Sequence, residues 1–162
     1  MRINSHLRFE KNMAYDDLRK GRFSETGRAY FVTTVLADRR QACFNDFYCA
    51  RLVVVQMRDL HGAGEIDSMA WVVMPDHVHW LFQLKGINTL AGVIKKFKAR
   101  SAHKVNRYLE RHGSLWQKAY YDHALRKEEE ILDIARYIVA NPLRAGLVKH
   151  IGDYAHWDAA WL

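Results

Sequence analysis

The segment from Ser68 to Leu84 constrains the fold of this chain more than any other part of the sequence. Ser68 to Met74 (SMAWVVM) and His77 to Leu84 (HVHWLFQL) are both rich in β-branched and aromatic residues, which favour strands. Only Pro75 and Asp76 separate them, and a proline does not fit in a helix interior. The segment therefore predicts a β-hairpin with a two-residue connection.

Two elements are predicted before this hairpin. Ala29 to Leu36 (AYFVTTVL) has the composition of a first strand. Asn45 or Asp46 can then cap a helix that runs to about Leu60 and is stopped by Gly62.

Three elements are predicted after the hairpin. Asn88 to about Leu109 has apolar residues at intervals of three and four, which predicts one buried face of a helix. Leu115 to Arg126 (LWQKAYYDHALR) is interpreted as a fourth strand and its exit. Glu128 to Asn141, with acidic residues in its first turn, is interpreted as a last helix that Pro142 stops.

This order of elements is that of a ferredoxin-like α+β sandwich, in which helices cover one face of an antiparallel sheet and the other face is free. The chain has only two prolines and no linker, repeat or low-complexity tract. We therefore expect a basic arm over residues 1–27 and a single domain over residues 28–162.

Composition narrows the classes of function. No window approaches eighteen uninterrupted apolar residues and the N-terminus is polar, so we expect a cytoplasmic protein with no membrane partner. Cys43 and Cys49 are the only cysteines, so a metal site would need His, carboxylate or amide ligands. The net charge of +7 favours a polyanionic partner only if the charge is clustered.

Two histidines on the second hairpin strand form a candidate metal site. Side chains alternate along a strand, so His77 and His79 lie on one face, opposite the face of Val78 and Trp80. Two imidazoles at this spacing can converge on one cation. Taken alone, the pair is equally compatible with hydrogen-bonded structural histidines.

A second candidate group lies on the last helix. Tyr137 and Asn141 are four residues apart and share a helical face, beside an apolar stripe. A phenol can act as a nucleophile and an amide oxygen can bind a hard metal ion. The same residues also fit a packing tyrosine and a helix terminator, and the sequence pattern leaves both interpretations open.

Three segments in combination resemble a known family: WVVMPDHVHWLF, LWQKAYYDHALR and RYIVANPLRAGLV. The resemblance runs from about Gly27 to the C-terminus. It is to the single-tyrosine HUH transposases (His-hydrophobic-His) and, within them, to the REP-associated tyrosine transposases. It implies the ferredoxin-like fold, a divalent metal such as Mg²⁺ or Mn²⁺, and cleavage of single-stranded DNA near a short hairpin.

Carried over by position, the resemblance implies that His77 and His79 are metal ligands and catalytic residues, with Tyr137 as the nucleophile. It places Asn141 as the third ligand, where better-known relatives have the longer Gln. A tyrosine nucleophile yields a 5′-phosphotyrosine, which conserves the phosphodiester bond energy for rejoining. We expect a monomer, although some relatives are dimers.

DNA contacts are expected on the basic side of the third predicted helix and in the fourth strand: Lys95, Lys96, Lys98, Arg100, Lys104, Arg107 and His123. Tyr120 and Tyr121 are rival nucleophiles. Trp71, Trp80 and Trp116 are expected in the core.

Two other functions remain as alternatives. One is a non-enzymatic nucleic-acid-binding module on an RRM-like sheet, although the aromatic-rich motif of such sheets is not apparent in the sequence. The other is a metal-dependent hydrolase that activates water and does not need Tyr137.

Overall fold

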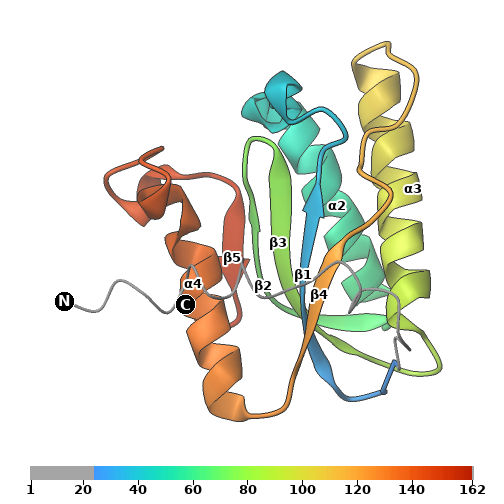
Figure 1. Cartoon of the computed structure of the whole chain (residues 1–162), viewed down its shortest axis with the longest axis vertical. Coiled ribbons are helices and arrows are strands. Elements are labelled where there is room, and N and C mark those ends of the chain that lie inside the picture. Colours follow the sequence, from blue (N-terminus) through green and yellow to red (C-terminus); the bar gives the residue numbers. More distant parts are fainter. Residues whose placement is uncertain (1–23, 162) are drawn as a thin grey trace.

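The computed structural model describes residues 24–161 (Figure 1). Its elements in chain order are β1 (Ala29–Val35), η1 (Arg39–Gln41), η2 (Cys43–Asn45), α2 (Phe47–Gly62), β2 (Ile66–Val73), β3 (His77–Leu84), α3 (Leu90–Tyr108), β4 (Tyr121–Leu125), α4 (Glu128–Arg144), η3 (Ile151–Asp153) and β5 (Trp157–Ala159). The expected basic arm, residues 1–27, lies almost wholly outside the described residues.

The five strands form one antiparallel sheet in the order β4-β1-β3-β2-β5. The first four strands have the connectivity of the ferredoxin-like sandwich, and this predicted fold class is confirmed. The hairpin is also as expected, since the Met74 amide donates to the His77 carbonyl across Pro75 and Asp76. The short strand β5 extends the sheet beside β2.

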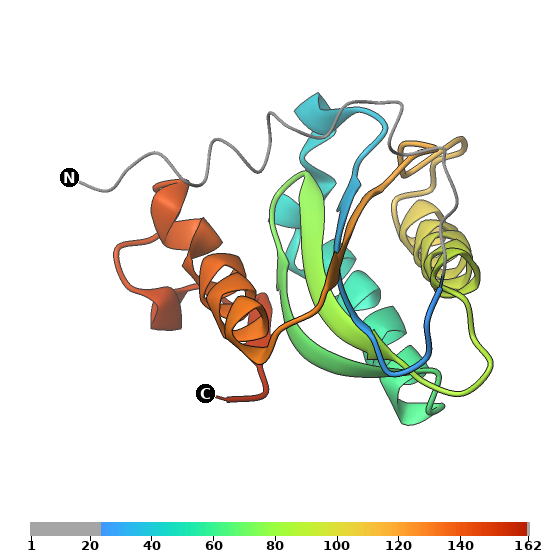
Figure 2. The ribbon, with the colours of Figure 1, turned by 60° about the horizontal axis from the view of Figure 1, so that its bottom comes forward.

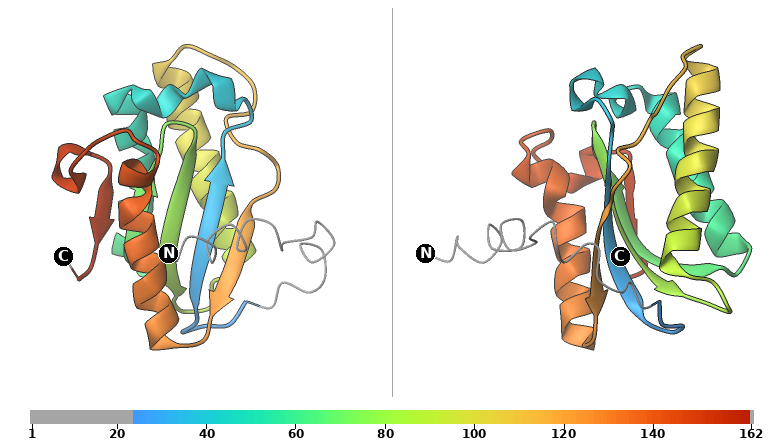
Figure 3. Two further views of the ribbon diagram at one scale, coloured as in Figure 1. Left: turned by 60° about the vertical axis from the view of Figure 1, so that its left-hand side comes forward. Right: turned by 45° about the vertical axis from the view of Figure 1, so that its right-hand side comes forward.

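Helices α2 and α3 cover one face of the sheet (Figures 1 and 3). Asp46 caps α2 by accepting a hydrogen bond from the Cys49 amide, and Thr89 caps α3 in the same way through Gly92. Large side chains fill the space between these helices and the sheet, with the ring of Phe97 5.3 Å from Trp80 and 5.6 Å from Trp116. The expectation that Trp80 and Trp116 are core residues is correct, and Trp71 packs against the same cluster.

The other face of the sheet is not free, which corrects the prediction. Helix α4 lies against it, on the side opposite α2 and α3 (Figure 2). The apolar stripe of α4 accounts for this, because Ile134, Ala135 and Ile138 are buried on the sheet residues Val72 and Leu81. We call this side of the sheet the α4 face.

The last helix is longer and the fourth strand shorter than the sequence indicated. Pro142 does not stop α4, which continues to Arg144. Pro142 lies two residues from the helix end and lacks only its own amide donor, and Ala145 still donates to the Asn141 carbonyl. The segment before Tyr121 is a loop, with an isolated β-bridge between Trp116 and Leu36, the residue after β1.

No helix in the part of the chain that the structure describes is long and apolar enough to span a bilayer.

Candidate functional site

The paired histidines lie at the start of β3, on the α4 face. Their ring centroids are 4.7 Å apart. In the sheet register His77 is opposite Val35 and His79 is opposite Thr33 of β1. The period of two in the strand therefore does bring the imidazoles together, as expected.

Each imidazole is held through its Nδ1 atom. His77 Nδ1 donates to Asp76 Oδ1 over 2.6 Å, and Arg39 Nε donates to Asp76 Oδ2 over 2.6 Å. Burial opposes the charge on Asp76, but these two hydrogen bonds outweigh it and hold the pKa of Asp76 below its usual value. With Nδ1–H bound to a carboxylate, the lone pair of His77 is on Nε2.

The second histidine is buried, unlike the side chain expected on an open sheet face. His79 is 7% exposed, and its Nδ1 lies 2.7 Å from Thr33 Oγ1 in a hydrogen bond. Burial, and secondarily the neighbouring His77, lower the pKa of His79 to about 3. The imidazole is therefore neutral at physiological pH, which is the form that binds a metal ion.

Tyr137 reaches this pair from α4. Its ring centroid is 5.7 Å from that of His79, and Phe31 of β1 contacts both rings, at 5.4 Å from His79 and 6.0 Å from Tyr137. A residue of the last helix and two residues of the hairpin thus form one cluster, although about sixty positions separate them in the chain.

Arg144 is a member of the cluster that the sequence analysis missed. Its guanidinium carbon lies 4.9 Å from the centre of the Tyr137 ring. A signal was present, because Arg144 follows Tyr137 by seven residues and Asn141 by three, which places all three on one face of a helix. The sequence pattern hides it because Pro142 predicts that the helix ends before Arg144.

The donor set fits a small divalent cation, although it is sparse. Among residues 24–161 no three His, Cys, Asp or Glu side chains cluster as metal ligands, so a third described ligand would be another oxygen donor, such as an amide. Asn141 Nδ2 donates to the Tyr137 carbonyl over 2.9 Å, which leaves its Oδ1 for a cation. Orientation of both imidazoles through Nδ1 is typical of metal-binding histidines.

Helix α3, which carries the basic residues, lies on the opposite side of the sheet from α4, which carries Tyr137 (Figure 3). Two of these basic residues are engaged within the protein. Lys96 pairs with Glu65 over 2.7 Å, and Lys98 donates to the carbonyls of Gln117 and Ala119. Of the other residues predicted to contact DNA, Lys95, Arg100, Lys104 and Arg107 are exposed on this helix.

The other residues named from the sequence are in or next to β4. Tyr120 is buried against Lys98, whose Nζ lies 5.3 Å from the ring centre. Tyr121 is opposite Thr33 and His123 is opposite Phe31, so both of these exposed residues lie on the α4 face. Aromatic side chains are therefore present on this face of the sheet, contrary to the sequence interpretation.

The fold is that of the class that the motifs resemble, the single-tyrosine HUH transposases. A family model described as "Transposase IS200 like" matches residues 27–141. The chain belongs to this family of DNA-cleaving transposases, and the resemblance stated from its motifs is confirmed.

Two curated relatives are similar over most of their length. An Escherichia coli K12 protein named a REP-associated tyrosine transposase is 26% identical over 136 residues, covering 82% of this chain and 77% of the relative. A Haemophilus influenzae protein, provisionally given the same name, is 26% identical over 140 residues and covers 80% and 78%.

Solved structures give the same result for the fold. A REP-associated tyrosine transposase bound to a REP hairpin is 25% identical, with a TM-score of 0.69 and coverage of 85% of this chain and 79% of that one. A Deinococcus radiodurans protein provisionally assigned as a transposase is 24% identical, with a TM-score of 0.52 and coverage of 74% and 95%.

Proposed function

We propose that this protein cuts and rejoins single-stranded DNA beside a REP-like hairpin, through a covalent 5′-phosphotyrosine on Tyr137. The observation that carries the proposal is the ring contact between Tyr137 and His79, with His77 directly beside it. The REP hairpin bound by the similar solved structure supports the choice of DNA. We expect the chain to act as a monomer.

In the cutting step, the Tyr137 oxygen attacks the scissile phosphorus and the bond from phosphorus to the 3′ oxygen breaks. The phenol gives up its proton and the departing oxygen takes one, so the products are a phosphotyrosine and a free 3′-hydroxyl. Rejoining is the reverse attack by a 3′-hydroxyl and needs no ATP, since one phosphodiester replaces another.

A free phenol has a pKa of about 10, so only about 0.1% of it is ionised at pH 7. The guanidinium of Arg144 lies over the Tyr137 ring, and its positive charge would favour the phenolate and so offset this handicap. A Mg²⁺ or Mn²⁺ ion, held by His77, His79 and Asn141, would supply Lewis-acid chemistry at the phosphate.

The hairpin in its single-stranded context, incubated with Mg²⁺ or Mn²⁺, tests the proposal. We expect an adduct of protein and DNA that survives SDS. Tyr137→Phe should abolish this adduct and leave DNA binding intact, because only the phenolic oxygen is lost. Tyr121→Phe is the matched control and should form the adduct normally.

An adduct of normal yield in Tyr137→Phe would move the nucleophile to Tyr120 or Tyr121. Cleavage with no adduct in the unmodified protein would instead favour the water-activating hydrolase. Binding with neither cleavage nor adduct would favour the RRM-like module.

A further inference from the structure

Helix α4 covers only part of its face of the sheet. It packs mainly over β2, with smaller contacts to β3, β5 and β4, and no other helix within residues 24–161 covers the rest of β1 and β4 on this face. The side chains on this part are Phe31 and Thr33 from β1, both half-buried, and Tyr121 and His123 from β4, both exposed. We call these four residues the β1–β4 strip.

The β1–β4 strip is continuous with the candidate site. Thr33 bonds His79 and is flanked by Tyr121 on the next strand. Phe31 contacts both His79 and Tyr137 and is flanked by His123. Tyr121 is 41% exposed, so one face of an aromatic ring is presented two strands away from His79.

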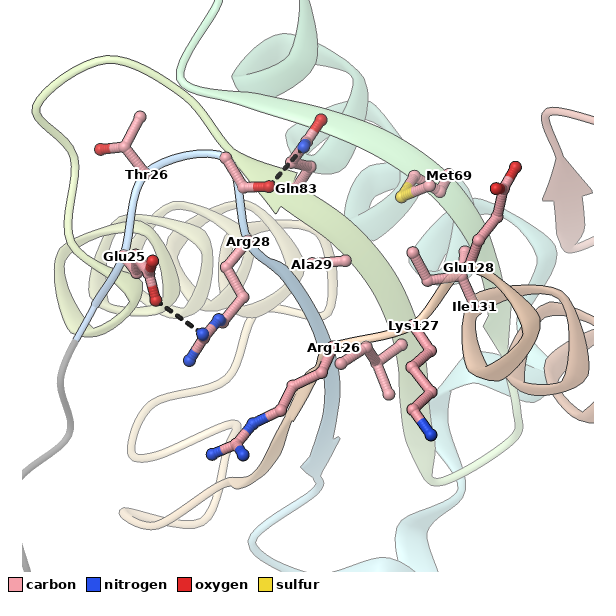
Figure 4. A pocket seen from close by; sticks show the side chains of 12 residues that line it. Glu25, Thr26, Arg28, Ala29, Met69, Gln83, Arg126, Lys127, Glu128 and Ile131 are labelled. Atoms are coloured by element: carbon pink, nitrogen blue, oxygen red, sulfur yellow. Dashed lines mark hydrogen bonds and ion pairs between the residues drawn. The ribbon is translucent and has the colours of Figure 1, made fainter.

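A pocket of about 440 Å³ lies at the far end of the strip, where β1 and β4 meet the start of α4 (Figure 4). The side chains at its rim include Arg28, Arg126 and Lys127. Arg28 pairs with Glu25 over 2.8 Å. Glu128 also lines the pocket, and Glu130 attracts Lys127 and accepts from the Arg126 amide. Within the described chain, however, neither Arg126 nor Lys127 forms a side-chain ion pair, so both can still reach an anion.

We propose that the unpaired strand next to the hairpin lies along the β1–β4 strip, with bases stacked on Tyr121 and Phe31 and its far end at the Arg126 and Lys127 pocket. This inference rests on the proposed function, because the strand must pass Tyr137 to be cut. It assigns the single-stranded DNA to one face of the sheet and leaves the basic residues of α3 for the hairpin stem.

The chemistry of the strip favours an unpaired strand over a duplex. Exposed aromatic rings hold nucleic acid by stacking, which needs bases that are not already stacked in a helix. The cations at the pocket complement the phosphates of such a strand. A protein partner would instead need a larger apolar surface than these few side chains provide.

Binding of two probes separates this site from the rest of the interface. Both carry the same hairpin; one has about six unpaired nucleotides beside it and the other has blunt ends. Affinity is measured without metal and in a Tyr137→Phe background, so that no cleavage occurs. Tyr121→Thr keeps a strand-forming residue but removes the ring. It should lower the affinity for the tailed probe about fivefold to twentyfold and leave the affinity for the blunt probe unchanged.

Matched variants complete this experiment. Tyr48→Thr removes an exposed aromatic ring from α2, on the other side of the sheet, and should change neither affinity. Tyr121→Phe should restore the tailed affinity. Arg126→Gln should lower the log-log salt slope for the tailed probe by about one unit, whereas Arg58→Gln on α2 should not.

If Tyr121→Thr loses affinity equally for both probes, or loses none for the tailed probe, the inference is overturned. Its failure is distinguishable from that of the proposed function. A wild-type adduct with no effect of Tyr121→Thr overturns the β1–β4 strip alone, and a Tyr121 effect without any adduct overturns the Tyr137 nucleophile alone.

Discussion

The two faces of the sheet differ in the side chains that cover them. The face under α2 and α3 belongs to a cluster of 24 buried residues, including Trp80, Phe82 and Phe97. The corresponding cluster under α4 has 10 buried residues, four of them alanine. The α4 face also contains hydrogen-bonded polar groups such as Thr33 and His79. The first face therefore supplies most of the apolar burial, and the second accommodates reactive groups beside a smaller core.

The largest effect should be a difference in the free energy of unfolding between core substitutions on the two faces. Phe97→Ala leaves a cavity between two tryptophans and should cost about 3–5 kcal/mol, whereas Ile138→Ala under α4 should cost about 2 kcal/mol. Urea unfolding measures both free energies. Ile138→Ala should nevertheless reduce the yield of adduct, because it loosens the helix that carries Tyr137. Equal costs at the two positions would contradict the comparison.

A smaller effect should come from removing the Asp76 carboxylate, which orients His77. Asp76→Asn removes the carboxylate that accepts from Nδ1 and should weaken Mn²⁺ binding about tenfold to a hundredfold. Metal titration of the free protein measures this directly. Asp133→Asn, which disrupts only an exposed pair with Arg136, is the control. Unchanged Mn²⁺ affinity in Asp76→Asn would mean that Asp76 and its ion pair with Arg39 stabilise the hairpin turn and do not support metal binding.

Alkaline pH should weaken one buried tyrosine contact beside the α4 face. Burial raises the pKa of Tyr154 to about 12, and its hydroxyl donates to the Val73 carbonyl. Between pH 10 and 12 the unfolded chain loses this proton while the folded chain keeps it, so stability falls as pH rises. Tyr154→Phe should remove about 1 kcal/mol of that pH dependence, as measured by unfolding at pH 8 and pH 11. An identical pH profile in the variant would contradict the assignment.

The smallest effect should come from removing a buried polar pair. Thr33→Val with His79→Leu replaces two hydrogen-bonded groups by apolar ones and should change stability by less than about 1 kcal/mol. Thr33→Val alone leaves the imidazole without its partner and should cost about 1–3 kcal/mol. Thermal denaturation distinguishes them. A strongly destabilised double variant would show that His79 is held by shape and not by its hydrogen bond.

Periodic patterns predicted most of the fold. The alternation along β3 correctly placed His77 and His79 together, and the three- and four-residue spacing correctly gave the buried side of α3. Local patterns do not specify which surface a helix packs against. The stripe containing Ile134 and Ile138 was recognised, but its position on the second face of the sheet was not.

The contacts around the site that the sequence did not predict share one physical cause, since they join residues far apart in the chain. The contact between Arg39 and Asp76 joins residues 37 positions apart, and Lys96 meets Glu65 across 31 positions. No spacing rule covers such pairs, because tertiary packing creates them. Pro142 led to a different error. As a strong local signal it predicted the end of the helix, but the helix is anchored on the sheet and continues to Arg144.

The outer strands of the sheet are short, five residues in β4 and three in β5. An exposed strand edge offers unpaired amides and carbonyls to any other chain, and short edges limit the number of such bonds. The described sheet is therefore a poor template for cross-β growth. Molecules of this protein crowded onto neighbouring hairpins of one DNA strand should remain separate particles and not fuse through their sheets.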